Sequence, residues 1–249
     1  MSLPSVQEIE AASLVAWPAL EDIRDGSWSV RFSRGYTNRA NSVQSLDPAD
    51  DSDVEARINR HAADYRTRGL TPVFRVTPLA GPQTVSTLDT LGWAPFGHSL
   101  VMARELKKVA RPVSAHTQYF EPADPLWWQP QRDMSEREGK DALGEVVTRI
   151  TAPARGILLF GEDLEPVAAA LVVNVEGIAM FLNVVVAAAA RGQGLGRAVM
   201  NAGLNWATLQ SKATTAALQV AADNEQAVPL YRSLGFEEIY QYHYRKPAA

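Results

Sequence analysis

The segment Val184–Gly203, VVVAAAARGQGLGRAVMNAG, constrains the fold more than any other part of the sequence. Three valines end a predicted strand, and the apolar side chains that follow from Leu195 onward recur with the period of a helix. Three glycines, Gly192, Gly194 and Gly196, lie at the turn between them. Glycine weakens regular structure, but it allows positive φ angles and a close approach to the backbone. A chain tolerates such a glycine-rich turn for a tight bend or for a ligand.

Three phosphate-binding patterns can be tested against this turn. The Rossmann pattern G-x-G-x-x-G fails, because Arg197 or Val199 would occupy the position of the third glycine. The P-loop pattern fails, because no Lys-Ser or Lys-Thr pair follows the glycines. The pattern R/Q-x-x-G-x-G/A is matched by Arg191, Gly194 and Gly196. The first N–H groups of the following helix have no internal acceptor and lie at the positive end of its dipole, so they can bind a pyrophosphate.

Hydrophobic periodicity predicts further helices and strands along the chain. Strands are expected at residues 28–32, 72–78, 98–106, 116–120, 156–161, 166–175, 178–186, 215–221 and 236–245. Helices are expected at residues 4–20, 54–69, 84–91, 195–209 and 224–234, with a further helix around Leu143–Ile150. The motifs SDVE (Ser52–Glu55) and SERE (Ser135–Glu138) have the spacing of a capping box, which would begin two of these helices.

Two ordered motifs in the second half resemble those of the GNAT superfamily of N-acetyltransferases. The segment NVVVAAAARGQGLGRAVMNAGLNWA resembles its acetyl-CoA-binding motif. The segment Leu218–Glu238, LQVAADNEQAVPLYRSLGFEE, is similar to the next motif, a strand, an asparagine and a helix carrying L-Y-x-x-x-G-F. The resemblance covers roughly residues 115–246. It implies an α/β (α+β) fold with a mixed central sheet flanked by helices, and the transfer of an acetyl group from acetyl-CoA to an amine.

The resemblance also assigns the residues that bind acetyl-CoA. The strand residues Val184, Val185 and Val186 would pair with the pantetheine arm, and the N–H of Val186 would polarise the thioester carbonyl. The pyrophosphate would lie at Arg191, Gly192, Gln193, Gly194, Leu195, Gly196 and Arg197. Tyr231 matches the general acid that protonates the CoA thiolate, and the alternative is a packing residue on a helix. Asn224 matches a residue that bonds the pantetheine, and a plain N-cap role is equally open.

The sequence does not identify a general base. An alkylammonium group has a pKa near 10.4, so its deprotonation at pH 7 costs about 4.6 kcal/mol and needs a proton acceptor or a water chain. Asn183 cannot take a proton, and His243 lies on the strand that often borders the acceptor in this superfamily. No two of the four histidines have the spacing of metal ligands, so no metal site is expected. The alternative to an enzyme is a non-catalytic acyl-CoA-binding sensor or regulatory module.

The first half looks like a degenerate copy of the same fold. Both halves end with a strand, a short helix and a strand, and the helices close with TLGW and SLGF. The segment RGYTNRAN (34–41) stands where the glycine turn would be, and Leu88 stands where Tyr231 is. The first half is therefore expected to be a scaffold or one wall of the acceptor site. The alternative is that the shared ending is only a common helix C-cap.

A charged, proline-containing segment, Lys107–Ser114, is predicted to link the halves. It would divide the chain into a degenerate domain at 1–108 and a catalytic domain at 113–249. The whole chain also resembles a bacterial group of two-part acetyltransferases that carry a GYTxRANS-like stretch, here Gly35–Ser42.

Composition and charge exclude several classes of function. The net charge of −4 and the pI of about 5.6 argue against nucleic acid as the main partner and leave only a local basic patch open. The absence of cysteine excludes disulfides and thiolate catalysis, and suits a cytoplasmic protein. No apolar run reaches the length of a membrane helix, and the N-terminus lacks the basic region of a signal peptide. The expected partners are acetyl-CoA and an unidentified amine, and the chain is expected to be a monomer or a homodimer.

Overall fold

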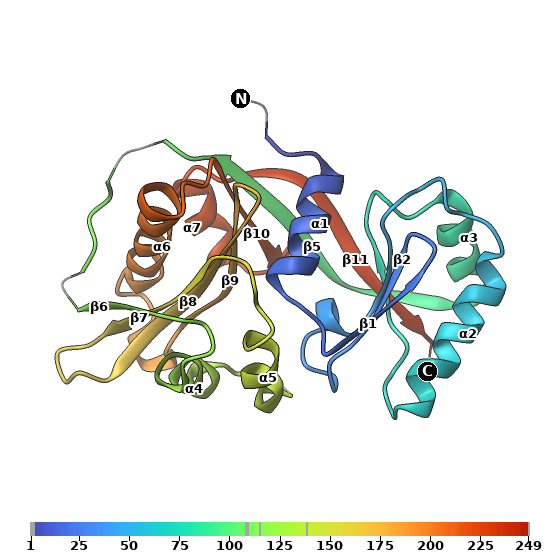
Figure 1. Cartoon of the computed structure of the whole chain (residues 1–249), viewed down its shortest axis with the longest axis horizontal. Coiled ribbons are helices and arrows are strands. Elements are labelled where there is room, and N and C mark those ends of the chain that lie inside the picture. The colour runs from blue at the N-terminus through green and yellow to red at the C-terminus, as the bar shows by residue number, and fades with distance from the viewer. Residues whose placement is uncertain (1–2, 108–109, 115, 138, 249) are drawn as a thin grey trace.

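A mixed β-sheet runs through the whole molecule (Figure 1). The computed structural model describes residues 3–107, 110–114, 116–137 and 139–248. In this part of the chain the sheet has 11 strands in the order β1-β2-β3-β4-β11-β5-β10-β9-β8-β7-β6. The strands are β1 (Glu21–Asp25), β2 (Trp28–Phe32), β3 (Val43–Ser45), β4 (Phe74–Val76), β5 (Trp93–Glu105), β6 (Thr117–Phe120), β7 (Ala154–Phe160), β8 (Pro166–Val175), β9 (Ile178–Val186), β10 (Thr215–Ala221) and β11 (Glu237–Pro247). The α-helices are α1 (Val6–Ala16), α2 (Val54–Thr67), α3 (Pro82–Thr90), α4 (Pro125–Met134), α5 (Leu143–Val147), α6 (Leu195–Asn205) and α7 (Ala227–Ser233).

The two halves of the chain exchange their last strands. The pairs β3–β4 and β9–β10 are parallel, and each has a helix between its strands. The strand β11 from the second half pairs antiparallel with β4, and β5 from the first half pairs antiparallel with β10. β5 and β11 also pair with each other and run side by side through the middle of the molecule (Figure 1). The two halves therefore share one sheet. Their division into domains at 1–108 and 113–249 stays a prediction.

Helices cover both faces of the sheet in the second half. Leu158, Ala169 and Leu171 lie in the core beneath α1, α4 and α5, whereas Ile157 and Ala168 lie in the core beneath α6 and α7. Neighbouring strand residues thus face opposite helix layers. Burial on both faces explains why β8 is an almost continuous apolar run. A third core, under α2 and α3, belongs to the first half.

Four predicted strands have the expected bounds, namely β2, β8, β9 and β10. The strands β1 and β3 were not expected from the sequence, because β1 is polar and exposed and β3 has three residues. The predicted linker contains residues 108 and 109, which lie outside the described residues. Nearby, Asn205 fixes this segment to α6 by accepting from the Arg111 backbone N–H at 2.9 Å and donating to its carbonyl at 2.8 Å.

The predicted equivalence between RGYTNRAN and the glycine turn is wrong. The loop 34–41 precedes β3, whereas the segment that leads from β3 into α2 is 46–53. This segment contains four aspartates, Asp47, Asp50, Asp51 and Asp53, so its charge opposes phosphate binding. The error arose because β3 is too short to show strand periodicity.

Neither predicted capping box caps the expected helix. α2 begins after Asp53, which has a left-handed φ of 51° and makes no side-chain cap. Ser135 is the C-cap of α4 rather than the start of a helix, and Glu138 lies outside the described residues. The apolar residues expected on the following helix form only the short α5, after a turn at Gly139 with φ 66°. None of the helices in the described part of the chain combines the length and apolar character needed to cross a bilayer.

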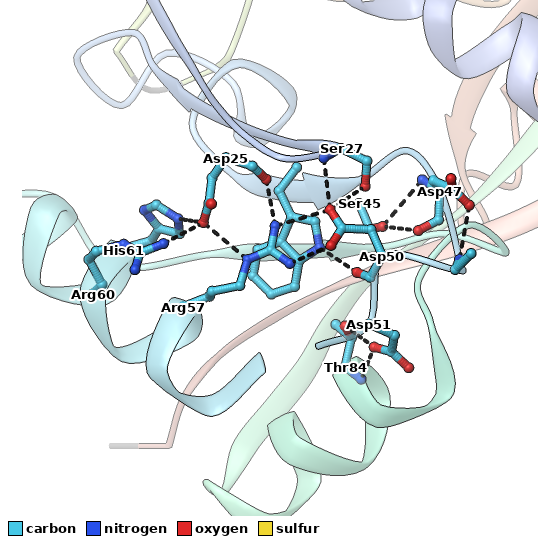
Figure 2. A network of polar contacts seen from close by, with 12 residues as sticks. Asp25, Ser27, Ser45, Asp47, Asp50, Asp51, Arg57, Arg60, His61 and Thr84 are labelled. Carbon is cyan, nitrogen blue, oxygen red and sulfur yellow. Dashed lines mark hydrogen bonds and ion pairs between the residues drawn. The ribbon is translucent and has the colours of Figure 1, made fainter. Parts of the chain in front are cut away.

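A polar network fixes α2 to the β1–β2 hairpin at the far end of the first half (Figure 2). The guanidinium group of Arg57 donates to Asp50 Oδ1 at 2.8 Å and to Asp25 Oδ2 at 3.1 Å. The same guanidinium lies 4.0 Å from the centre of the Trp28 ring. Hydrogen bonds from Arg57, together with those from Ser27, hold the pKa of Asp50 at about 2.

This network predicts a loss of stability in acid. A folded-state pKa below the unfolded value of about 3.9 stabilises the fold fully above about pH 5, and this contribution is lost as the pH falls towards 2. Asp50→Asn should lower the free energy of unfolding by about 1–2 kcal/mol at pH 7 and weaken the pH dependence between pH 4 and 2. Thermal unfolding from pH 2 to 7 measures both effects. Asp53→Asn, which removes an aspartate without a side-chain cap, is the matched control. Equal curves for Asp50→Asn and the parent would contradict the prediction.

Candidate active site

The strands β9 and β10 diverge part-way along their length. The last pair of their parallel ladder is Phe181 with Leu218, although β9 continues to Val186. Asn183 lies just after this point with a left-handed φ of 49°, and the register of β9 against β8 shifts there. Such a bulge bends a strand and ends its pairing. Within the described residues, Val184–Val186 therefore has no strand partner on the side facing away from β8.

A cavity of about 740 Å³ lies between the end of β9, the N-terminus of α6 and the helix α7. Eleven of the twelve residues predicted from the sequence line it: Val184, Val185, Val186, Arg191, Gly192, Gly194, Leu195, Gly196, Arg197, Asn224 and Tyr231. Gln193 is exposed and lies outside it. Residues from two separate motifs therefore meet around one space.

The glycine turn presents the N-terminus of α6 to this cavity. Gly192 and Gly194 have φ angles of 80° and 78°, which side chains with a Cβ rarely adopt. A Cβ on Gly196 would lie 3.1 Å from the Leu230 side chain, so this glycine allows α6 and α7 to pack closely. No side chain caps α6, and its first backbone bond runs from Ala198 to Gly194. The preceding N–H groups have no helical acceptor and lie at the positive end of the dipole.

Two arginines flank this helix start. Arg197 donates to Ser233 Oγ at 2.6 Å and so connects α6 with the end of α7. Arg191 forms an ion pair of 2.9 Å with Glu136, a cavity residue that was not predicted from the sequence. Glu136 belongs to the SERE motif. That motif was interpreted as a helix cap, so a role for Glu136 at the cavity was not predicted.

Tyr231 is buried on α7, with 7% of its surface exposed. Its ring lies 6.1 Å from that of Phe236 in an edge-on arrangement. Burial raises the pKa of Tyr231 to about 12, which the charge of Arg137 partly offsets. The phenol is therefore protonated at neutral pH and can donate its proton.

A second cavity, of about 320 Å³, adjoins the first. The two share the lining residues Val184, Asn224, Ala227 and Tyr231. Residues from both halves surround the second cavity, including the loop residues Thr37–Arg39, Ser99 on β5 and Tyr242 on β11. The loop 34–41, predicted as the counterpart of the glycine turn, thus contributes lining residues to the second cavity instead.

Comparison with known proteins identifies the family of the chain. The family described as "Probable histone acetyltransferase Rv0428c C-terminal" matches residues 4–245. The chain is 26% identical over 252 residues to the "Uncharacterized N-acetyltransferase YobR" of Bacillus subtilis (strain 168), covering 98% of this chain and 99% of that protein. The chain belongs to this family of GNAT N-acetyltransferases.

Solved GNAT structures share the fold of the whole chain. A GCN5-related N-acetyltransferase from Kribbella flavida superposes with a TM-score of 0.74 at 16% identity, covering 100% of this chain and 97% of that one. A tandem GNAT protein from the clavulanic acid biosynthesis pathway gives a TM-score of 0.66 at 12% identity, covering 100% and 91%. The expected α/β GNAT fold with a tandem arrangement is confirmed, and the protein is an acyltransferase.

Asn224 has a structural contact at the start of the GNAT helix α7. Its Oδ1 accepts from the Ala227 N–H at 2.9 Å, as a helix-start residue does. The residue also lines both cavities. Pro229 is the third residue of the helix, and α7 begins at Ala227, later than predicted.

The candidate His243 does not line either cavity. His243 stacks on His98 with ring centres 5.2 Å apart, and its Nε2 accepts from Arg245 Nε at 3.1 Å. In the described residues, no three His, Asp or Glu side chains lie together as metal ligands. Among the described residues, no histidine lines either cavity.

Proposed function

We propose that the protein transfers the acetyl group of acetyl-CoA to the amine of a small molecule or peptide. The donor would bind in the larger cavity and the acceptor in the smaller one. The observation that carries this proposal is the position of Tyr231, a buried phenol shared by both cavities. The acetyl group of a donor bound in the larger cavity would then lie next to an amine bound in the smaller one.

The donor cavity offers groups for two parts of acetyl-CoA. The free N–H groups at the start of α6, with Arg191 and Arg197, suit the pyrophosphate, and Gly192 and Gly194 allow its close approach. The unpaired edge of Val184–Val186 suits the extended pantetheine arm, which can accept and donate as an added strand would. The N–H of Val186 is the proposed donor to the thioester carbonyl. Asn224 is proposed to bond the pantetheine with the amide hydrogens that its cap contact leaves unused.

The reaction would proceed by direct attack. The neutral amine nitrogen forms a bond with the thioester carbonyl carbon, and the carbon–sulfur bond breaks. The sulfur takes the Tyr231 proton and leaves as the free thiol of CoA. The amine proton is lost to water, and the phenolate is reprotonated.

The first test is calorimetric titration with acetyl-CoA. The parent should bind, and the double variant Arg191→Glu, Gly194→Asp should lose at least tenfold in affinity, because two negative charges face the pyrophosphate. The double variant Arg34→Glu, Gly69→Asp, outside both cavities, serves as a matched control. Equal affinity of parent and turn variant would overturn the proposed donor site.

Glu136 should weaken donor binding in the parent. Its carboxylate neutralises Arg191, so a pyrophosphate must compete with it. Glu136→Gln should tighten acetyl-CoA binding two- to fivefold, the range expected for an exposed ion pair. Asp133→Asn, which breaks the exposed pair with Arg132 instead, should leave the affinity unchanged. Weaker binding by Glu136→Gln would show that Glu136 supports the site rather than competing for it.

Tyr231→Phe should lower kcat 10- to 100-fold and change the Kd of acetyl-CoA less than twofold, because the ring remains and the proton is lost. Release of CoA can be followed with a thiol reagent, and the chain itself contributes no cysteine to the signal. Tyr119→Phe removes a hydroxyl outside both cavities and is the control. An unchanged kcat for Tyr231→Phe would remove Tyr231 from the proposed reaction.

A further inference from the structure

The smaller cavity carries positive charge without a matching carboxylate. Arg39 and Arg137 are its charged lining residues, and no aspartate or glutamate from the described residues lines it. The other groups around it are neutral, among them Asn38, Gln219 and Tyr242. In the described part of the chain, no ion pair within 4.0 Å joins either arginine to a carboxylate.

The loop that carries Arg39 is held firmly in place. The side chain of Asn41 accepts from the backbone N–H of Ser33 at 2.7 Å and of Gly35 at 3.0 Å. It also donates to the carbonyls of Tyr36 and Thr37, both at 2.9 Å. A single buried amide thus fixes four backbone groups of the loop.

Two further contacts hold this loop against the first half. Trp17 Nε1 donates to Thr37 Oγ1 at 2.9 Å, and the buried Arg31 donates to the carbonyl of Arg39 at 3.0 Å. The backbone of Arg39 is therefore preorganised before any ligand binds, which lowers the entropic cost of binding.

The guanidinium group of Arg39 has unused hydrogen-bonding capacity. Its Nε is buried and has no hydrogen-bond partner. A buried donor without a partner costs free energy, and a ligand acceptor would remove that cost. The planar guanidinium matches a carboxylate or a phosphate, to which it can donate two parallel hydrogen bonds.

We infer that the acceptor is a small amine that also carries a carboxylate or phosphate group, and that Arg39, assisted by Arg137, binds this anionic group. The inference rests on the proposed function, since it names the substrate class of the same site. A simple alkylammonium or a lysine-rich peptide would bring positive charge to two unpaired arginines and would be repelled. An anionic group on the acceptor reverses this balance.

The same positive charge bears on the missing general base. Nearby cations disfavour the protonated form of an amine. Once its anionic group is bound by Arg39, the amine of the acceptor lies in a cavity whose remaining charge favours the neutral, nucleophilic form. Proton loss to water then needs no carboxylate in the cavity, and none of the described lining residues carries one.

The test compares amines in matched pairs that differ by the anionic group: tyramine with tyrosine, tryptamine with tryptophan, and ethanolamine with phosphoethanolamine. A histone H3 tail peptide is the cationic alternative. Two measurements are made on the full chain, the thermal shift without donor and the release of CoA with acetyl-CoA. At least one carboxylated or phosphorylated amine should raise the Tm and exceed its partner tenfold in kcat/KM, and the amino acids and phosphoethanolamine distinguish carboxylate from phosphate.

Arg39→Gln should abolish this preference, mainly through a higher KM for the acceptor, and leave the KM of acetyl-CoA unchanged. Arg34→Gln, an exposed arginine in the same loop that pairs with Glu145, should behave as the parent. The inference is overturned if the amines without an anionic group, or the histone peptide, are the better substrates throughout. It is also overturned if no carboxylated or phosphorylated amine raises the Tm, or if Arg39→Gln keeps the preference of the parent. Failure of acetyl-CoA to bind would instead refute the proposed function, because the thermal shift is measured without it.

Discussion

The place of β11 between β4 and β5 is the constraint on which the rest of the molecule depends. A buried ion pair secures it, because Glu10 on α1 accepts from Arg75 on β4 at 3.0 Å, and Tyr240 on β11 donates to the same carboxylate. Both charged side chains are almost wholly inaccessible to water. Burying two charges is costly, so the pair adds little net stability, but breaking it would leave an uncompensated charge inside the protein. The network therefore favours this strand order over alternatives.

Exchange of the last strands brings both halves of the chain to the candidate site. The second half supplies the glycine turn and Tyr231, which line the larger cavity. The first half supplies Thr37–Arg39 and part of β5 to the smaller cavity. In the first half, the segment equivalent to the glycine turn holds four aspartates. Asp50 binds Arg57, and Asp51 accepts from the Thr84 N–H at the start of α3 (Figure 2). The first half has thus kept the fold and lost the features that suit a phosphate.

The sequence predicted what depends on local pattern. The glycine turn, the apolar strands of the second half and the helix carrying Tyr231 are each encoded within about 20 neighbouring residues, so periodicity and motif spacing located them. The contact of Glu136 with Arg191 and the place of Arg39 in a cavity depend on segments far apart in the chain. The two predicted capping boxes were wrong because the same residue spacing also occurs by chance, and only the surrounding structure decides whether a helix begins there. Strand exchange has no local signal, since it depends on which strands meet in space.

The strained bulge at Asn183 lies next to Val184, a residue that lines both cavities. Its left-handed backbone is strained, and it ends the β9–β10 ladder, so the hydrogen bonds that Val184–Val186 would make with a neighbouring strand are not formed. At the bulge, the side-chain amide of Gln131 donates a hydrogen bond to the Asn183 carbonyl at 3.4 Å. Val184, on the edge that this divergence leaves unpaired, and Tyr231 line both cavities. Local strain at Asn183 therefore accompanies the open strand edge beside which the proposed donor and acceptor sites meet.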